Sequence, residues 1–471
     1  MKCLRTCTLL LVCLCTFGLV LQTTFKPQLF TTHGIHRSLT INTYTDLADN
    51  ENRTGALDHL RPSQKPTKVP AGHPSDWRVN ELVASRLEQI SNMHRERRVD
   101  CAAVIRNNKT AMAEAISVAK NLADTRDKNF NINIHLMNQT QNCSHFLKEY
   151  GFITDVLSKE EEEFPIAYSL VAYTDTETAL RLLRSIYRVQ NVYCIHVDIS
   201  ATSRTMGALT SVVSCLPNAF ISSRRVNVQW GHFTVLEAEL ICLQDLWRHK
   251  KWKYFINLTG QEFPLKNNFE LVKILKSYKG ANDVHGTIKY RRLNRWNFQE
   301  LPHNLTGIKG WVHVSLSRPF VDFTLHDPRS QDLLDFLKGT WIPDESFFST
   351  LNHNTQLGIP GSFVGLNETE QRVGEKPTFN RYKMWGRNPC AKNTVRDICI
   401  LSTGDLPRMV ASDFLFANKF FLNEDRVVIG CLEERLMNKT RDYYMGRLQF
   451  NTSVYENSVI VKNRIRDETG G

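Results

Sequence analysis

Between about residues 164 and 280, short apolar runs alternate with segments whose apolar residues recur at helical spacing. The segments predicted as strands are 164–172, 191–198, 219–221 and 254–258, and those predicted as helices are 174–187, 203–214, 234–248 and 268–278. Strands that alternate with helices predict an α/β fold, a mostly parallel, doubly wound sheet flanked by helices. Ligands of such sheets bind beyond the carboxyl ends of the strands, where Asp198 and the turn 259–262 fall.

The regions on either side of this pattern are organised differently. An apolar run follows Lys2 and Arg5, which predicts a cytoplasmic tail over 1–7 and a signal-anchor transmembrane helix over 8–25, with a cleaved signal peptide as the alternative. Residues 26–99 are polar and proline-containing and predict a stem. We expect the main folded domain over 100–440, and a loosely held polar tail over 441–471.

Composition narrows the compartment and the partners. The 59 Lys and Arg exceed the 48 Asp and Glu and give a net charge of +11, but they are dispersed, which disfavours nucleic-acid binding. Eight of the twelve cysteines lie beyond residue 100 and none forms a C-x-x-C pair. An oxidising lumen with up to four disulfides explains them better than zinc, and about 105 pairings are open. Nine N-x-[ST] sequons agree with a lumen. Asn257 is expected to be buried and unmodified, and the candidate glycosylation sites are Asn52, Asn108, Asn138, Asn142, Asn304, Asn367, Asn438 and Asn451.

Several charged residues are candidates for chemistry, each with a simpler structural role as the alternative. Glu345, among aromatic residues, has the setting of a general base, or is a carboxylate at a helix N-terminus. Arg396 and Lys419 are single cations in apolar segments, suited to a diphosphate or to a salt bridge such as Arg396 with Asp397. Asp198 is a ligand-facing acid or a cap, and the patch around Arg292 is a binding surface or a solvated face.

The absence of motifs excludes several enzyme classes. The sequence has no G-x-G-x-x-G, P-loop, H-E-x-x-H or G-x-S-x-G motif. No motif therefore supports a dinucleotide-binding protein, a P-loop nucleotide-binding protein, a zincin metalloprotease or a serine hydrolase. It also has no D-x-D, so a divalent-metal diphosphate site is not supported, and no metal ligand or cofactor is predicted.

Over about 100–440 the chain resembles the core 2 / I-branching β-1,6-N-acetylglucosaminyltransferases, a Golgi glycosyltransferase family. The segments that carry the resemblance are 182–187, 190–198, 252–258, 263–266, 343–345, 404–406 and 415–420. The resemblance implies a GT-A-like fold without D-x-D, in a type II protein of the Golgi membrane whose catalytic domain is luminal. It implies inverting, metal-independent transfer of GlcNAc from UDP-GlcNAc in β-1,6 linkage to an O-glycan, Galβ1-3GalNAc on Ser/Thr (core 2). The alternatives are a core 4 or I-branching acceptor, another UDP-sugar, or a non-catalytic glycan-binding protein. The oligomeric state stays open.

The resemblance also assigns roles to residues. Glu345 matches the catalytic base. Asp198, Trp230, Arg396 and Lys419 match donor-side positions, the last two stabilising the departing UDP in place of a metal. On the acceptor side the matching residues are Arg292, Arg295 and Trp385. The implied disulfides are Cys101–Cys431, Cys143–Cys215, Cys194–Cys242 and Cys390–Cys399. Two acceptor-side departures point to a different acceptor or to weak activity: Val284 stands where an acceptor-contacting Glu is expected, and 310–314 differs from the family's segment.

Overall fold

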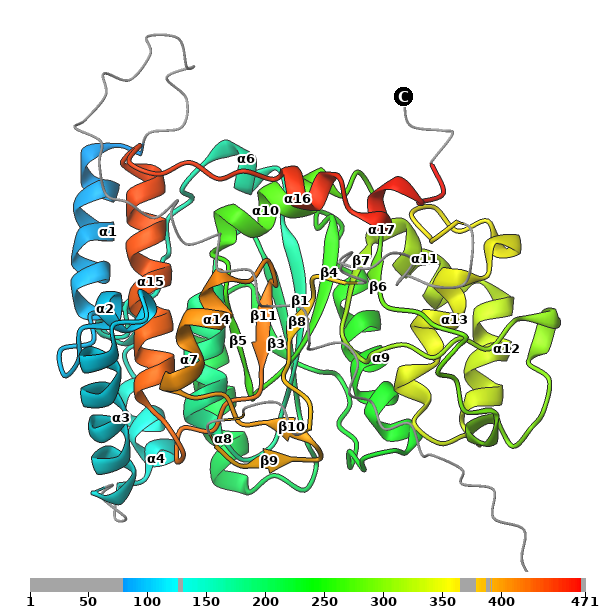
Figure 1. Cartoon of the computed structure of the whole chain (residues 1–471), viewed down its shortest axis with the longest axis horizontal. Coiled ribbons are helices and arrows are strands. Elements are labelled where there is room, and N and C mark those ends of the chain that lie inside the picture. The colour runs from blue at the N-terminus through cyan, green and yellow to red at the C-terminus, as the bar shows by residue number, and fades with distance from the viewer. Residues whose placement is uncertain (1–78, 126–129, 365–377, 387–389, 391, 467–471) are drawn as a thin grey trace, which may run out of the picture. The chain divides into compact units, whose positions relative to one another are not determined.

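A six-stranded sheet forms the centre of the computed structural model, which describes residues 79–125, 130–364, 378–386, 390 and 392–466 (Figure 1). Its order is β3-β2-β1-β4-β7-β6, and its first four strands are parallel while β7 runs antiparallel to both neighbours. The strands are β1 Ile166–Ala172, β2 Val192–Val197, β3 Ala219–Ile221, β4 Tyr254–Thr259, β6 Asp283–Val284 and β7 Val314–Ser317. The predicted mixed α/β fold with a mostly parallel sheet is confirmed.

Helices cover both faces of this sheet, which is why its strands are almost continuously apolar. On β1, Tyr168 and Leu170 pack with α7, α8 and α10, whereas Ala167, on the opposite face, packs with α9, α11, α12 and α13. The helices that cover the two faces are α7 Thr176–Ile186, α8 Ser203–Ser214, α9 Phe233–Trp247, α10 Asn268–Ser277, α11 Arg318–His326, α12 Pro328–Leu337 and α13 Phe347–His353.

The start of α7 corrects a detail of the sequence pattern. Residues 174–177 have the form of a capping box, which would make Thr174 the cap. In the structure Asp175 is the N-cap and accepts a hydrogen bond from the backbone N–H of Thr178 at 3.1 Å. Glu177, which the box would turn back on the cap, forms an ion pair with Arg426 instead.

Two small sheets lie where the sequence pattern gave no clear elements. One joins β5 Glu262–Pro264, β11 Phe416–Asn418 and β8 Arg381–Tyr382, and the other is a hairpin of β9 Thr394–Val395 and β10 Ile398–Cys399. The remaining helices are α1 Glu81–Met93, α2 Cys101–Ile105, α3 Lys109–Asp124, α4 Ile132–Gln139, α5 Cys143–Glu149, α6 Lys159–Glu162, α14 Leu406–Ala411, α15 Val427–Tyr444, α16 Ser453–Glu456 and α17 Val459–Lys462.

Both predicted boundaries of the folded domain are corrected by the structure. The predicted stem, 26–99, includes α1, whose Leu87 and Ile90 are buried in a cluster with Met437 of α15. The predicted tail, 441–471, includes the end of α15 and the buried Ile460 of α17, which packs into the core of the sheet. Because both segments are short and mostly polar, only their packing partners reveal that they belong to the fold.

The structure contains the four disulfides that the resemblance implies. Cys101–Cys431 joins α2 to α15 across 330 residues, and Cys194–Cys242 ties β2 to α9. Cys143–Cys215 links α5 to the end of α8, and Cys390–Cys399 closes a loop at β10. Disulfides of this kind agree with an oxidising lumen.

The described residues include only some of those predicted to cross the membrane or to carry a glycan. The predicted anchor, Asn52 and Asn367 lie outside the described residues, and no helix within those residues is long and apolar enough to cross a membrane. Asn257 is buried, as expected. The structure argues against Asn438, which lies within α15 and accepts a hydrogen bond from Ser91 of α1 at 2.6 Å. The exposed sequons are Asn108, Asn138, Asn142, Asn304 and Asn451.

Candidate active site

Glu345 lies at the end of a short 3₁₀ helix, Pro343–Glu345, with its carboxylate between two cations. Arg295 Nη1 donates to Glu345 Oε2 at 2.8 Å, and Lys309 Nζ lies 3.8 Å from the same oxygen. Within the described residues no cation pairs with Oε1. The side chain is 25% exposed, so this carboxylate is fixed through one oxygen and open to solvent.

The backbone around Glu345 explains this placement. The N–H of Gly310 donates to the Glu345 carbonyl at 2.7 Å. A Cβ on Gly310 would lie 1.7 Å from Ser349 Oγ and 2.4 Å from the His285 carbonyl, so only glycine fits this approach. Gly310 is the first residue of the segment 310–314, and the departures from the family pattern follow it at residues 311–314.

The basic patch around Arg292 is only partly a solvated face. Arg295 contacts Glu345, and the buried Trp296 donates its indole N–H to Ser346 Oγ at 3.2 Å. Arg292 is exposed, and its charge together with that of Arg295 adds to burial in lowering the pKa of Lys309, against the opposing charge of Glu345. The patch therefore places positive charge around the candidate base.

Two further carboxyl groups lie close behind Glu345, and sequence reasoning missed both as parts of the site. Burial, and next the charge of Glu345, raise the pKa of Asp344 to about 7. Burial raises the pKa of Glu239 to about 8, although a hydrogen bond from Asn257 Nδ2 at 2.9 Å opposes the shift. Asp344 Oδ1 and Glu239 Oε1 are buried without a hydrogen-bond partner. Both carboxyl groups therefore have pKa values well above that of an ordinary surface carboxylate.

Two tryptophans and a guanidinium are in contact just before the Glu345 helix in the fold, since Trp341 precedes that helix by two residues. The Arg396 guanidinium lies 5.2 Å from the centre of the Trp230 ring, and Trp230 meets Trp341 edge to face at 5.5 Å. The backbone N–H of Trp341 in turn donates to the Arg295 carbonyl at 3.1 Å. Trp341, which sequence reasoning did not select, thus links the residues predicted for the donor side to those around Glu345.

Arg396 is presented by a tight hairpin turn rather than by a salt bridge to its neighbour. Arg396 and Asp397 have φ of 54° and 61° between β9 and β10, the conformation of a two-residue turn with both central residues left-handed. For a non-glycine residue this conformation costs on the order of 1 kcal/mol or more, and such strain is often found at functional sites.

Lys419 follows β11 and is held in the same positive environment. Its Nζ donates to the Val395 carbonyl at 3.4 Å, and burial together with the charge of Arg396 lowers its pKa. Burial lowers the pKa of Lys383, two residues before Trp385, to about 8. The charge of Glu345 opposes this shift and the charge of Lys419 adds to it. Lys383 Nζ lies 5.3 Å from the centre of the Trp385 ring. Trp385, half-exposed, is bridged to Ile398, so it borders the hairpin that carries Arg396.

A buried glutamate supports this cluster of cations. The fully buried Glu262 accepts hydrogen bonds from Arg381 Nε at 2.9 Å and from Asn418 Nδ2 at 3.0 Å. Asn418 is the residue before Lys419. The sequence placed Glu262 in a turn at a strand end but gave no sign that it is the buried counter-charge of the site.

Asp198 lies at the end of β2, and its carboxylate accepts hydrogen bonds from the segments that follow, including the loop that leads to Trp230. Its Oδ2 accepts from the Val228 N–H at 2.9 Å, and its Oδ1 accepts from Ser200 N and Oγ at 2.8 and 2.5 Å. The side chain therefore fixes a loop, and its contact with a donor stays a prediction. Within the described residues no group of three or more His, Cys, Asp or Glu is placed to hold a metal ion.

Comparisons with known proteins identify the family of the chain. A family model described as Core-2/I-Branching enzyme matches residues 166–410. The chain belongs to the Core-2/I-branching enzyme family. The N-acetyllactosaminide beta-1,6-N-acetylglucosaminyl-transferase of Mus musculus is 38% identical over 328 residues, 65% of this chain and 80% of that protein. The Beta-1,3-galactosyl-O-glycosyl-glycoprotein beta-1,6-N-acetylglucosaminyltransferase 3 of Homo sapiens is 33% identical over 373 residues, 73% of this chain and 84% of that protein.

Membership of this enzyme family confirms the resemblance, and it makes the chain a glycosyltransferase by descent. A solved mannosyltransferase of S. cerevisiae aligns at 12% identity and a TM-score of 0.23 over 48% of this chain and 76% of that one. The matched region contains Glu345, Arg295, Trp230 and Arg396, while Lys419 lies just beyond it. The individual roles of these residues stay predictions.

Proposed function

We propose that the chain transfers GlcNAc from UDP-GlcNAc, in β-1,6 linkage, to the sugar hydroxyl of an O-glycan, with inversion and without a metal ion. The observation that carries the proposal is Glu345, a half-buried carboxylate fixed through one oxygen, beside a cluster of cations and exposed tryptophans. The names of the relatives supply the sugar and the linkage.

In the proposed reaction Glu345 takes the proton of the acceptor hydroxyl as its oxygen attacks the anomeric carbon. A single displacement needs one base, inverts the anomeric centre and releases UDP. Arg396 and Lys419 face the diphosphate and stabilise the negative charge that develops on it. Arg295 and Lys309 orient Glu345. Trp230, Trp341 and Trp385 offer ring faces to sugar or uracil.

The acceptor we propose is Galβ1-3GalNAc, as the resemblance implies, with I-branching of poly-N-acetyllactosamine as a second candidate. Two observations favour keeping the second: the mouse relative named as an N-acetyllactosaminide transferase is 38% identical, and Val284 stands where an acceptor-contacting Glu is expected. Val284 is fully buried in β6, so that position cannot contact an acceptor here. We further propose a type II Golgi membrane location.

An acceptor panel tests the proposal. The full-length protein is incubated with UDP-GlcNAc and with Galβ1-3GalNAc, core 3 or poly-N-acetyllactosamine glycans, and the linkage of each product is read by NMR. A β-1,6-linked GlcNAc on one of these supports the function and names the branch. Binding of UDP without transfer to any of them would move the activity to another acceptor or donor, and no UDP binding would favour a non-catalytic protein.

A further inference from the structure

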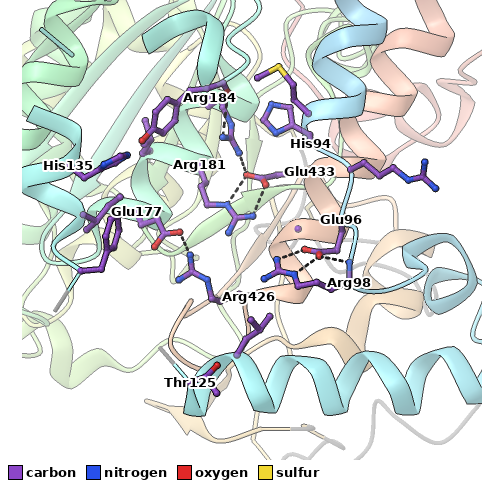
Figure 2. Close-up of a pocket in the computed structure, with 18 residues that line it drawn as sticks. His94, Glu96, Arg98, Thr125, His135, Glu177, Arg181, Arg184, Arg426 and Glu433 are labelled. Atoms are coloured by element: carbon purple, nitrogen blue, oxygen red, sulfur yellow. Dashed lines mark hydrogen bonds and ion pairs between the residues drawn. The ribbon is translucent and has the colours of Figure 1, made fainter. Parts of the chain in front are cut away.

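A cavity of about 720 Å³ lies away from Glu345, where the amino-terminal helices meet α7 and α15 (Figure 2). Its walls come from the end of α1 and the segment after it, from α3, α4, α7 and α15. None of its lining residues belongs to the group around Glu345, Arg396 and Lys419. The volume lies in the range of pockets that hold small organic molecules.

The charged residues of the cavity do not balance. Five arginines and three glutamates line it: Arg95, Arg98, Arg181, Arg184, Arg426, Glu96, Glu177 and Glu433. Arg181 and Arg184 share the single carboxylate of Glu433, whereas Arg98 pairs with Glu96 and Arg426 with Glu177 (Figure 2). Among the described residues of the lining, the ion pairs therefore leave an excess of two positive charges.

This positive charge shifts the pKa values of two neighbouring groups. Burial, followed by the charge of Arg184, lowers the pKa of His94 to about 3, so this imidazole is neutral. Burial opposes ionisation of Glu433, yet the charges of Arg181 and Arg184 outweigh it and lower its pKa to about 2. An added anion would offset the same positive charge.

Cations that a ligand can reach lie at the edge of the cavity. Arg95 is exposed and forms no ion pair with another described residue, and the Arg98 side chain is 47% exposed. Apolar or aromatic side chains, from Leu122, Phe130, Ile132 and Leu180, form much of the remaining wall, and the Phe130 ring lies 5.4 Å from that of His135. A ligand complementary to both parts has an anionic group and a ring or other apolar body.

We propose that this cavity binds a small organic oxyanion, a sugar or similar ring that carries a phosphate or sulfate ester, with the ester at the arginines and the ring against Phe130. Guanidinium groups recognise tetrahedral oxyanions through paired N–H donors, and phosphate and sulfate esters share this geometry. The site is independent of the proposed transfer reaction, since no residue serves both.

Titration calorimetry on the full-length protein with saturating UDP, which occupies the proposed donor site, tests this inference. The probes share one sugar: N-acetylglucosamine 1-phosphate, N-acetylglucosamine 6-sulfate and uncharged N-acetylglucosamine. We expect one ester to bind at one site per chain, more weakly at higher salt, and the uncharged sugar not to bind. The ester that binds decides between phosphate and sulfate.

Exposed residues allow variants that do not disturb the buried ion pairs. Arg95→Gln is expected to weaken ester binding about tenfold, as the loss of one charge-assisted contact does. Phe130→Ala is expected to weaken it less, and Arg97→Gln is the matched control, since Arg97 is exposed but does not line the cavity. Absence of binding of both esters at millimolar concentration would overturn the proposal. So would ester binding that neither Arg95→Gln nor Phe130→Ala changes.

Discussion

Glu345 and Glu433 each lie between two cations, but they differ in exposure and in how many of their oxygens are bonded. Glu433 is 5% exposed and both of its oxygens are bonded to arginines of α7. Glu345 is 25% exposed, and both of its cations approach a single oxygen. A buried carboxylate with both oxygens bonded to arginines serves to hold the structure together, whereas one fixed through a single oxygen is oriented and still able to accept a proton.

The largest expected effect is on catalysis at Glu345, the more exposed of the two carboxylates. Glu345→Gln keeps the shape and the contact with Arg295 but removes the base, so kcat should fall by roughly 10²–10⁴-fold. The binding of UDP should stay within about twofold, since no donor-side contact is altered. Rates are measured with UDP-GlcNAc and the preferred acceptor, and UDP binding by calorimetry. Turnover close to that of the unmodified protein would remove Glu345 from the mechanism.

The matching change at the buried carboxylate should act on stability instead. Glu433→Gln leaves Arg181 and Arg184 buried without their counter-charge, which costs on the order of 3–5 kcal/mol. Thermal unfolding followed by circular dichroism should show a clear fall in Tm, and kcat per folded molecule should be unchanged. An unaltered Tm would mean that the two glutamates do not differ in the way proposed.

The donor-side cations should show an intermediate effect. Arg396→Ala and Lys419→Ala each remove one charge from the proposed diphosphate site, and each should weaken UDP binding by roughly 10–100-fold, the value of a hydrogen bond to a charged group. Lys159→Ala is a suitable control, because Lys159 pairs with Glu163 and their side chains are 79% and 65% exposed. Unchanged UDP affinity and kinetics in both variants would refute the idea that these cations replace a metal.

The smallest effect concerns Glu239, a buried carboxyl that forms no ion pair within the described part of the chain. Because burial raises its pKa from 4.5 to about 8, the folded state holds this proton more tightly than the unfolded state does. Stability should therefore fall as pH rises between about 4.5 and 8, and Tm should drop by roughly 4 °C between pH 5.5 and 8. Glu239→Gln should reduce that drop. Glu433, with its lowered pKa, contributes no slope in this range, and an equal slope in both forms would exclude Glu239 as the cause.

The same two regions show how far the sequence predicts the structure. Residues 164–280 have strict strand and helix periods, and their elements appear within a few residues of the predicted bounds. The site itself depends on contacts between distant segments. Trp341, Lys309 and Glu262 join it through a backbone hydrogen bond, an ion pair and a buried network, none of which leaves a local pattern.

Single residues show the same limit. The sequence identified Glu345 and Arg396 from their unusual neighbours, and the resemblance supplied their roles. It could not tell that Arg295 contacts Glu345 whereas Arg292 faces solvent, because both are arginines on one irregular segment. Likewise Asn438 matches a glycosylation motif but meets Ser91 in a helix contact that depends on the fold of α1.

The central claim is that a carboxylate base and fixed cations carry out the transfer without a metal ion. It is tested most directly by measuring GlcNAc transfer by the full-length protein in excess EDTA, and by reading the anomeric configuration of the product by NMR. The account predicts an unchanged rate and a β-linked product. Loss of activity in EDTA that manganese restores, or an α-linked product, would contradict it.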